Sequence, residues 1–148
     1  WQLKQKIGPL ASAVAGLKAL REQPSKITVR GGDYSASSTG ENISGELVLI
    51  GNGKFYGGSF DIFPGADLRD GLLDVCVFPK VNTASLLGLV PGFIVRRKLP
   101  EKRVRRLRAQ RFELTSDGPA AFELDGEWAG HLPATFSVER EKLRVVVP

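Results

Sequence analysis

LLDVCVF, residues 72–78, is a run of almost continuous apolar side chains with the length of an ordinary β-strand. A second run of this kind, ELVLI, stands at residues 46–50. Because the apolar residues follow one another without alternation, both runs indicate strands that are covered on both faces. Shorter strand patterns occur at residues 27–29, 112–114 and 121–124. Several short strands at close spacing predict a mainly β fold, specifically a β-sandwich-like domain.

Two helices and a terminal hairpin complete the expected elements. Residues 8–22 carry apolar side chains at helical spacing, which predicts an N-terminal helix. A short mid-chain helix is expected to begin near Ala84 and to bend or end at Pro91. At the end of the chain, residues 136–138 and 143–147 flank a polar segment, as the two arms of a hairpin do.

Length and composition predict one folded domain. The 148 residues are 42% hydrophobic and 25% charged, which is far from the composition of a disordered chain. The single cysteine, Cys76, excludes an intrachain disulfide and is expected to be a buried thiol in a reducing cytosol. The longest apolar stretch, residues 86–95, is about half a membrane span, so no transmembrane helix is expected.

The positive charge is concentrated in one segment, residues 96–111, which we call the basic strip. It holds nine basic residues and one acidic residue, whereas the whole chain has a net charge of only +5. The basic residues are Arg96, Arg97, Lys98, Lys102, Arg103, Arg105, Arg106, Arg108 and Arg111. Such a strip indicates a polyanionic partner, or it is a plain solvated face. No aromatic residue for base stacking lies between Phe93 and Phe112, so a nucleic acid is not expected as the partner.

Residues 61–74 hold four carboxylates around a glycine turn: Asp61, Asp67, Asp70 and Asp74. Carboxylate and carbonyl oxygens are the ligands that Mg²⁺ and Ca²⁺ prefer, so a hard cation is one interpretation. The spacing is not that of an EF-hand. The alternative is an ordinary Asp-Gly corner before a strand.

A second acidic turn lies in FELDGEW, residues 122–128. Asp125 and Glu127 flank Gly126, and two carboxylates this close together are an arrangement that can supply a general base. The alternative is a solvated turn with Trp128 packed beneath it.

Glycine-rich segments occur at two further places. Gly57-Gly58 would let a backbone approach a phosphate closely, although Asn52-Gly53 just before it is also a common hairpin turn. Gly31-Gly32 is not a phosphate loop, because neither a Walker lysine nor a helix follows it. His131 is the only histidine, which leaves almost nothing from which to build histidine-based catalysis or a zinc site.

Three segments, taken in order, resemble the C-terminal half of the diacylglycerol kinase-like lipid kinases, a family that includes sphingosine and ceramide kinases and is distantly related to NAD kinases. They are Asn52-Gly53-Lys54-Phe55-Tyr56-Gly57-Gly58, then Pro64-x-Ala66-x-x-x-Asp70-Gly71-x-Leu73-Asp74, then Leu124-Asp125-Gly126-Glu127. The segment at residues 8–17 resembles the entry to that half, so the similarity covers nearly the whole chain. Tyr56 and Ser59 depart from the family's more glycine-rich pattern.

The resemblance implies a two-domain parent. Residues 1–148 would be its C-terminal, lipid-side domain, and an N-terminal nucleotide-binding domain would be absent from this chain. By similarity, Glu127 accepts the proton of the lipid hydroxyl, while Asp125 and Gly126 line the nucleotide side of the cleft. Phosphoryl transfer depends on positioning and charge neutralisation, and a base on a rigid strand end fits that chemistry.

The resemblance also implies the ligands and the location. A structural Mg²⁺ would be held by the Asp70 side chain and by the backbone carbonyl groups of Asp67 and Leu72. ATP is the expected co-substrate, bound mainly by the missing domain, and the second substrate is a lipid alcohol that the sequence does not specify. We expect a cytoplasmic protein, peripheral to an anionic membrane surface, and a homodimer stays open. The competing hypothesis is a non-catalytic β-domain that binds polyanions through the basic strip.

Overall fold

The structure is a computed structural model, and it describes residues 25–32, 42–56, 60–81 and 104–139. The two helices expected from the sequence lie outside these ranges, as does the second arm of the C-terminal hairpin. Within the described ranges, no helix is long and apolar enough to cross a membrane.

Every regular element in these ranges is a β-strand. The strands are β1 (Ile27–Gly32), β2 (Ile43–Gly45), β3 (Leu47–Gly51), β4 (Phe55–Tyr56), β5 (Phe60–Asp61), β6 (Leu73–Phe78), β7 (Arg105–Ala109), β8 (Arg111–Ser116), β9 (Ala121–Leu124), β10 (Glu127–His131) and β11 (Ala134–Ser137). The mainly β character predicted from the sequence is therefore confirmed.

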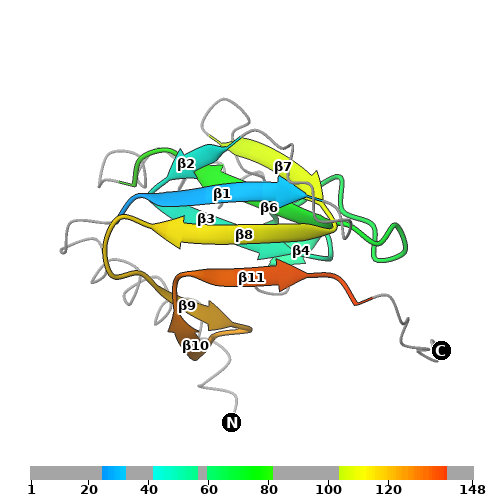
Figure 1. The fold of residues 1–148 in the computed structure, drawn as a ribbon. Coiled ribbons are helices and arrows are strands. Elements are labelled where there is room, and N and C mark those ends of the chain that lie inside the picture. Colours follow the sequence, from blue (N-terminus) through cyan, green and yellow to red (C-terminus); the bar gives the residue numbers. More distant parts are fainter. Residues whose placement is uncertain (1–24, 33–41, 57–59, 82–103, 140–148) are drawn as a thin grey trace, which may run out of the picture.

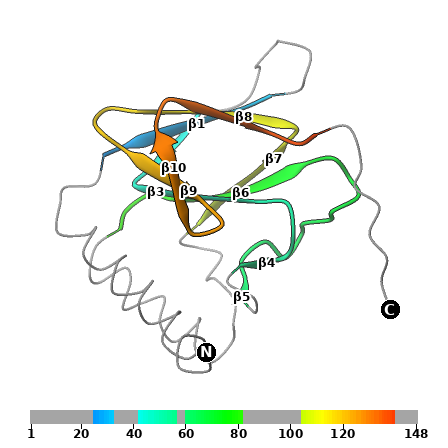
Figure 2. The same cartoon turned by 90° about the horizontal axis from the view of Figure 1, so that it is seen from below.

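The strands form two layers, which Figure 2 shows edge-on. One layer is a four-stranded sheet in the order β11-β8-β1-β2, and the other is a three-stranded sheet in the order β3-β6-β7. All pairings within both sheets are antiparallel. Two smaller ribbons, β4–β5 and β9–β10, lie beside the layers (Figure 1). This arrangement confirms the predicted β-sandwich.

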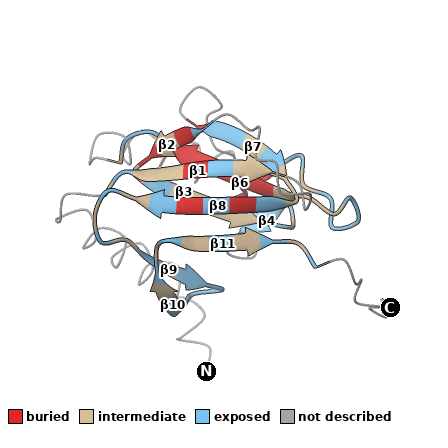
Figure 3. Cartoon of the chain, in the orientation of Figure 1, coloured by how far each residue is buried: buried red, intermediate tan, exposed pale blue. Residues whose placement is uncertain are grey.

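The main core lies between the two layers. Val29 of β1 and Phe112 of β8 are completely buried, and they pack with Val75 and Val77 of β6. Along β8, buried residues alternate with exposed ones, because successive side chains of a strand point to opposite faces of the sheet. Figure 3 shows these buried positions along β1, β6 and β8. One face of the four-stranded sheet is therefore in the core and the other is in solvent.

β6 is buried on both of its faces, as its unbroken apolar sequence predicts. Its second face, which carries Cys76 and Phe78, packs with Ile62 and Phe63 in a separate apolar cluster. The ring of Phe63 lies directly over the backbone of Gly51, since a Cβ atom at Gly51 would be 2.4 Å from it. The segment between β5 and β6 thus covers the outer face of the three-stranded sheet.

Two local features differ from the sequence predictions. Asn52-Gly53 is not a hairpin turn, because β3 pairs with β6 whereas β4 pairs with β5. Here the pairing with the buried strand β6 outweighs the local turn preference. The second feature is β7, a strand in the middle of the basic strip, where frequent arginines mask the alternation of a strand.

Candidate active site

The β9–β10 hairpin holds the residues for which the sequence predicts catalysis and nucleotide binding. Leu124 pairs with Glu127, so the connection consists of Asp125 and Gly126 alone. Both turn residues have positive φ angles, 51° at Asp125 and 88° at Gly126. A two-residue turn of this kind matches the twist of the strands that it joins, and Asp-Gly is among its preferred sequences. The sequence LDGE thereby makes Glu127 the first residue of β10.

The hairpin is irregular on its second strand. The register shifts between Trp128 and Gly130, which marks a β-bulge, and Gly130 has a φ of 152°. A Cβ atom at Gly130 would lie 3.3 Å from the Phe122 ring. The Phe122 ring in turn meets the Phe136 ring edge-on, with centroids 5.3 Å apart. This contact ties the hairpin to β11 and hence to the four-stranded sheet.

The acidic turn is exposed, as the solvated-turn interpretation has it, but Trp128 does not pack beneath it, so that part of the interpretation is wrong. Its side chain is 71% exposed, and its aromatic contact is an edge-on approach to His131 at 5.9 Å. The physical reason is visible in Figure 1, where the hairpin projects past the edge of the sandwich and neither of the two described sheets lies beneath it. Leu124, 55% exposed, adds a second uncovered apolar side chain to the same hairpin.

Chemically, the hairpin tip presents carboxylates that a ligand can reach. Asp125, Gly126 and Glu127 are all exposed. The backbone of Glu127 is held by the strand pairing with Leu124, whereas Asp125 lies in the turn itself. A carboxylate with a defined position and open access can accept a proton from a bound hydroxyl group.

The four carboxylates of residues 61–74 do not converge on one point. Asp61 is buried, 3.9 Å from the Lys54 ammonium group, and one of its carboxylate oxygens has no hydrogen-bond partner. Asp67 closes its own turn, because its Oδ1 atom accepts a hydrogen bond from the Arg69 amide at 2.9 Å. Among the residues that the structure describes, no group of three or more histidine, cysteine or acidic side chains could hold a metal ion. A cation site built from side chains alone is therefore not found in the described ranges.

Asp70 and Asp74 share one partner, Arg108 of β7. The Arg108 guanidinium contacts Asp70 Oδ2, and its Nε atom lies 3.2 Å from Asp74 Oδ1. Burial raises the pKa of the Asp74 carboxyl above its ordinary value, while the nearby Arg108 charge acts in the opposite direction. Arg108 thus supplies the positive charge for both acids.

The predicted magnesium ligands lie together on the turn before β6. The carbonyl of Asp67 accepts the amide hydrogen of Asp70 at 3.2 Å, and Asp70 Oδ1 accepts the amide hydrogen of Leu72 at 2.8 Å. Since Arg108 occupies the other oxygen of Asp70, this side chain has no unpaired oxygen. Arg108 is thus already the charged partner of the carboxylate that the resemblance assigns to Mg²⁺, and the magnesium site stays a prediction. In Figures 1 and 2 this turn lies well apart from the tip of the β9–β10 hairpin.

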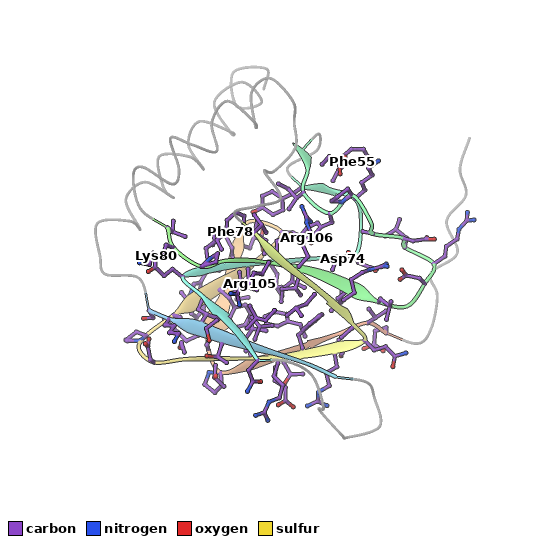
Figure 4. The ribbon with its side chains drawn as sticks, turned by 90° about the horizontal axis from the view of Figure 1, so that it is seen from above. Phe55, Asp74, Phe78, Lys80, Arg105 and Arg106 are labelled. Carbon is purple, nitrogen blue, oxygen red and sulfur yellow. The ribbon has the colours of Figure 1, made fainter. Side chains whose placement is uncertain are left out.

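The described part of the basic strip is mostly paired within the chain. Arg106 donates a hydrogen bond to the Ile62 carbonyl at 2.6 Å, and Arg111 lies 3.1 Å from Glu113. Arg108 is paired as described above. Figure 4 shows Arg106 and Asp74 on the side of the three-stranded sheet that faces away from the other layer, whereas Arg105 is on the opposite side. β7 therefore presents its arginines on two opposite faces. Residues 96–103 of the basic strip lie outside the described ranges.

Cys76 is a buried thiol, as the sequence predicts. Its sulfur lies 3.0 Å from the Arg106 guanidinium and 3.6 Å from the Ile62 carbonyl oxygen. Burial raises the pKa of the thiol to about 11, although Arg106 acts in the opposite direction. The thiol is therefore not a nucleophile at neutral pH.

The sequence interpretation missed two structural roles in the basic strip, those of Arg106 and Arg108. Both side chains are used to bind the segment between β5 and β6. The available signal was their spacing of two residues, which puts them on one face of a strand. It could have been recognised only with the knowledge that this part of the strip forms β7 next to β6.

The family of the chain is shown by a family model and by curated relatives. The model of the family described as "YegS C-terminal NAD kinase beta sandwich-like domain" matches residues 2–147. Among curated relatives, a "Probable lipid kinase YegS-like" from Xanthomonas oryzae pv. oryzae (strain MAFF 311018) is 35% identical over 131 residues, which are 84% of this chain and 40% of the relative. A diacylglycerol kinase from Bacillus subtilis (strain 168) is 25% identical over 99% of this chain and 47% of the relative.

A solved structure supports the fold independently. A diacylglycerol kinase from Bacillus anthracis str. Sterne superimposes with a TM-score of 0.55 at 22% identity, over 88% of this chain and 44% of that one. At this identity the likeness shows the fold alone. The chain thus spans less than half the length of these relatives, and the family match covers nearly all of it. The chain belongs to the family of YegS C-terminal NAD kinase beta sandwich-like domains.

Proposed function

We propose that this chain is the lipid-side domain of an ATP-dependent lipid kinase of the diacylglycerol kinase type. Family membership supports this proposal, as do the relatives named lipid kinase and diacylglycerol kinase. The observation that carries it is the position of Glu127. Two residues of positive φ form the turn before it, Glu127 is the first residue of β10, and it is exposed. A base for a substrate hydroxyl needs this combination of access and fixed position.

The proposed step is an in-line phosphoryl transfer. The lipid hydroxyl loses its proton to the Glu127 carboxylate as its oxygen forms a bond to the γ-phosphorus of ATP. The bond from that phosphorus to the β,γ-bridging oxygen breaks, and ADP leaves. Asp125 and Gly126 border the nucleotide in this arrangement, while the nucleotide-binding domain of the parent holds most of the ATP. Mg²⁺ bound with ATP supplies charge neutralisation on the phosphates.

The exposed side chain of Leu124 suits the binding of a lipid alcohol next to Glu127. Leu124 pairs with Glu127, so both side chains lie on one face of the hairpin. A lipid alcohol has an apolar chain next to its hydroxyl, and Leu124 offers apolar surface beside the proposed base. Trp128, which pairs with Glu123, lies on the opposite face.

The proposal includes a cytoplasmic location at an anionic membrane surface. The basic strip is the proposed contact, apart from Arg106, Arg108 and Arg111, whose side chains have partners within the chain. Each basic residue near such a surface contributes about 1 kcal/mol to binding. We expect co-sedimentation with liposomes to rise with anionic lipid content and to fall with salt. Equal binding to neutral liposomes, or binding to nucleic acid without binding to lipid, would favour the polyanion-binding domain instead.

The activity is tested by phosphate transfer from labelled ATP to lipid alcohols in mixed micelles. The assay compares this chain alone with the same chain joined to its nucleotide-binding domain. We expect labelled phospholipid from the two-domain protein, and none from the chain alone, because no phosphate-cradling loop occurs in its sequence. If the two-domain protein binds ATP but labels neither diacylglycerol nor a sphingoid base, the proposal is wrong for these substrates.

A further inference from the structure

The Arg108 guanidinium joins the turn before β6 to the sheet. Arg108 of β7 lies opposite Asp74 of β6 in the strand register and also reaches Asp70 in the turn. Asp74 is 8% exposed, and its Oδ2 atom accepts a hydrogen bond from Arg108 Nε at 3.3 Å. One planar cation thus joins a buried carboxylate on the strand to a carboxylate on the turn.

Both carboxylate oxygens of Asp70 already have a partner in this arrangement. One of its oxygens accepts the Leu72 amide hydrogen, and the other contacts Arg108. A divalent cation on Asp70 would have to bind next to the positive charge of Arg108 or displace it, and in the second case Arg108 would keep only Asp74. Mg²⁺ gives up its hydration water reluctantly, so it competes poorly for a carboxylate that already has a charged partner. Charge-assisted hydrogen bonds of arginine to carboxylates are also among the stronger ones in proteins.

We propose that Arg108 is the resident cation of the Asp70–Asp74 pair, and that it orders the turn before β6 without a divalent metal. The guanidinium contacts the carboxylate that the family resemblance assigns to a metal ion. This assignment is independent of the proposed kinase activity, since it concerns the stability and ion binding of the chain alone.

The test measures the thermal midpoint of the chain in MgCl₂ and in EDTA, for the wild type and for Arg108→Gln. The wild-type midpoint is expected to be the same in both buffers. Arg108→Gln should melt several degrees lower in EDTA, because it leaves two carboxylates without their cation, and MgCl₂ should restore part of that loss. Arg111→Gln is the matched control, because it removes an arginine from another exposed ion pair and should gain no response to MgCl₂.

Two results would overturn the proposal. The first is a wild-type midpoint that rises in MgCl₂ and loses this rise in Asp70→Asn, which would make the metal the resident cation. The second is an Arg108→Gln protein that folds but shows no response to MgCl₂.

Electron paramagnetic resonance of bound Mn²⁺ gives a second readout. This readout tests the proposal even if Arg108→Gln does not fold, because it uses the wild type and Arg108→Lys. The wild type and the charge-retaining Arg108→Lys are expected to bind no Mn²⁺ at this turn. Mn²⁺ binding by the wild type that Asp70→Asn abolishes would contradict the assignment.

Discussion

Cys76 illustrates how one residue takes its chemistry from its surroundings. It follows Val75 in a strand that is buried on both faces, and the segment before β6 covers its sulfur. Arg106 contacts the sulfur without making the thiol acidic, because the effect of burial exceeds that of the positive charge. The sequence predicted the burial correctly from the apolar neighbours. It gave no indication that an arginine would reach the same position.

The native thiol is expected to resist alkylation. A pKa of about 11 means that Cys76 stays protonated in the pH range where an ordinary cysteine becomes reactive. A raised folded-state pKa contributes stability below the ordinary value, and this contribution is lost as the pH rises through about 11. Mass spectrometry after iodoacetamide treatment at pH 8 should find little modification, and full modification in denaturant. Rapid labelling of the folded protein would show that the thiol is accessible.

At the scale of elements, the contact between Gly51 of β3 and Phe63 fixes the cover over the three-stranded sheet. Gly51→Ala would put a methyl group 2.4 Å from the ring, so the ring has to move out of a close-packed cluster. We expect a loss of about 1–3 kcal/mol in the free energy of unfolding, the usual cost of overpacking. Urea denaturation measures this loss.

Gly65→Ala is the matched control for this prediction. A Cβ atom at Gly65 would meet no atom within 4 Å, so the substitution should change stability little. Equal effects of the two substitutions would show that the contact with Phe63 is not what makes glycine necessary at position 51.

The elements differ in how far the sequence could predict them, for physical reasons. β6 was predictable because burial on both faces demands an unbroken apolar run. The Asp125-Gly126 turn was predictable because few sequences adopt two positive φ angles. β7 was not predictable, because its character as a strand depends on pairing with β6, which only the tertiary structure supplies. The exposure of Trp128 was not predictable either, because it depends on how the hairpin projects from the sandwich.

At the scale of the whole molecule, stability and the proposed catalysis depend on different parts of the described structure. The sandwich and the segment before β6 carry the buried core and the Arg108 ion pairs, which serve stability. The β9–β10 hairpin is largely exposed and carries the proposed base. This separation suits the proposed domain, which closes a cleft against a nucleotide-binding domain. The groups that contact the substrate have to be accessible before the two domains close. A solvated turn at the candidate residues was one of the two interpretations of the sequence, whereas the exposure of Trp128 became apparent only from the structure.

The most direct test of the account is the turnover of Glu127→Gln in the two-domain protein. The amide keeps the shape of the carboxylate but cannot take the hydroxyl proton, so kcat should fall by about 10²- to 10⁴-fold. Folding and the affinity for ATP should be nearly unchanged. Glu123→Gln is the control, because Glu123 lies on the other face of the same hairpin and should keep its activity. A Glu127→Gln protein that is folded and turns over at the wild-type rate would contradict the assignment of Glu127 as the base.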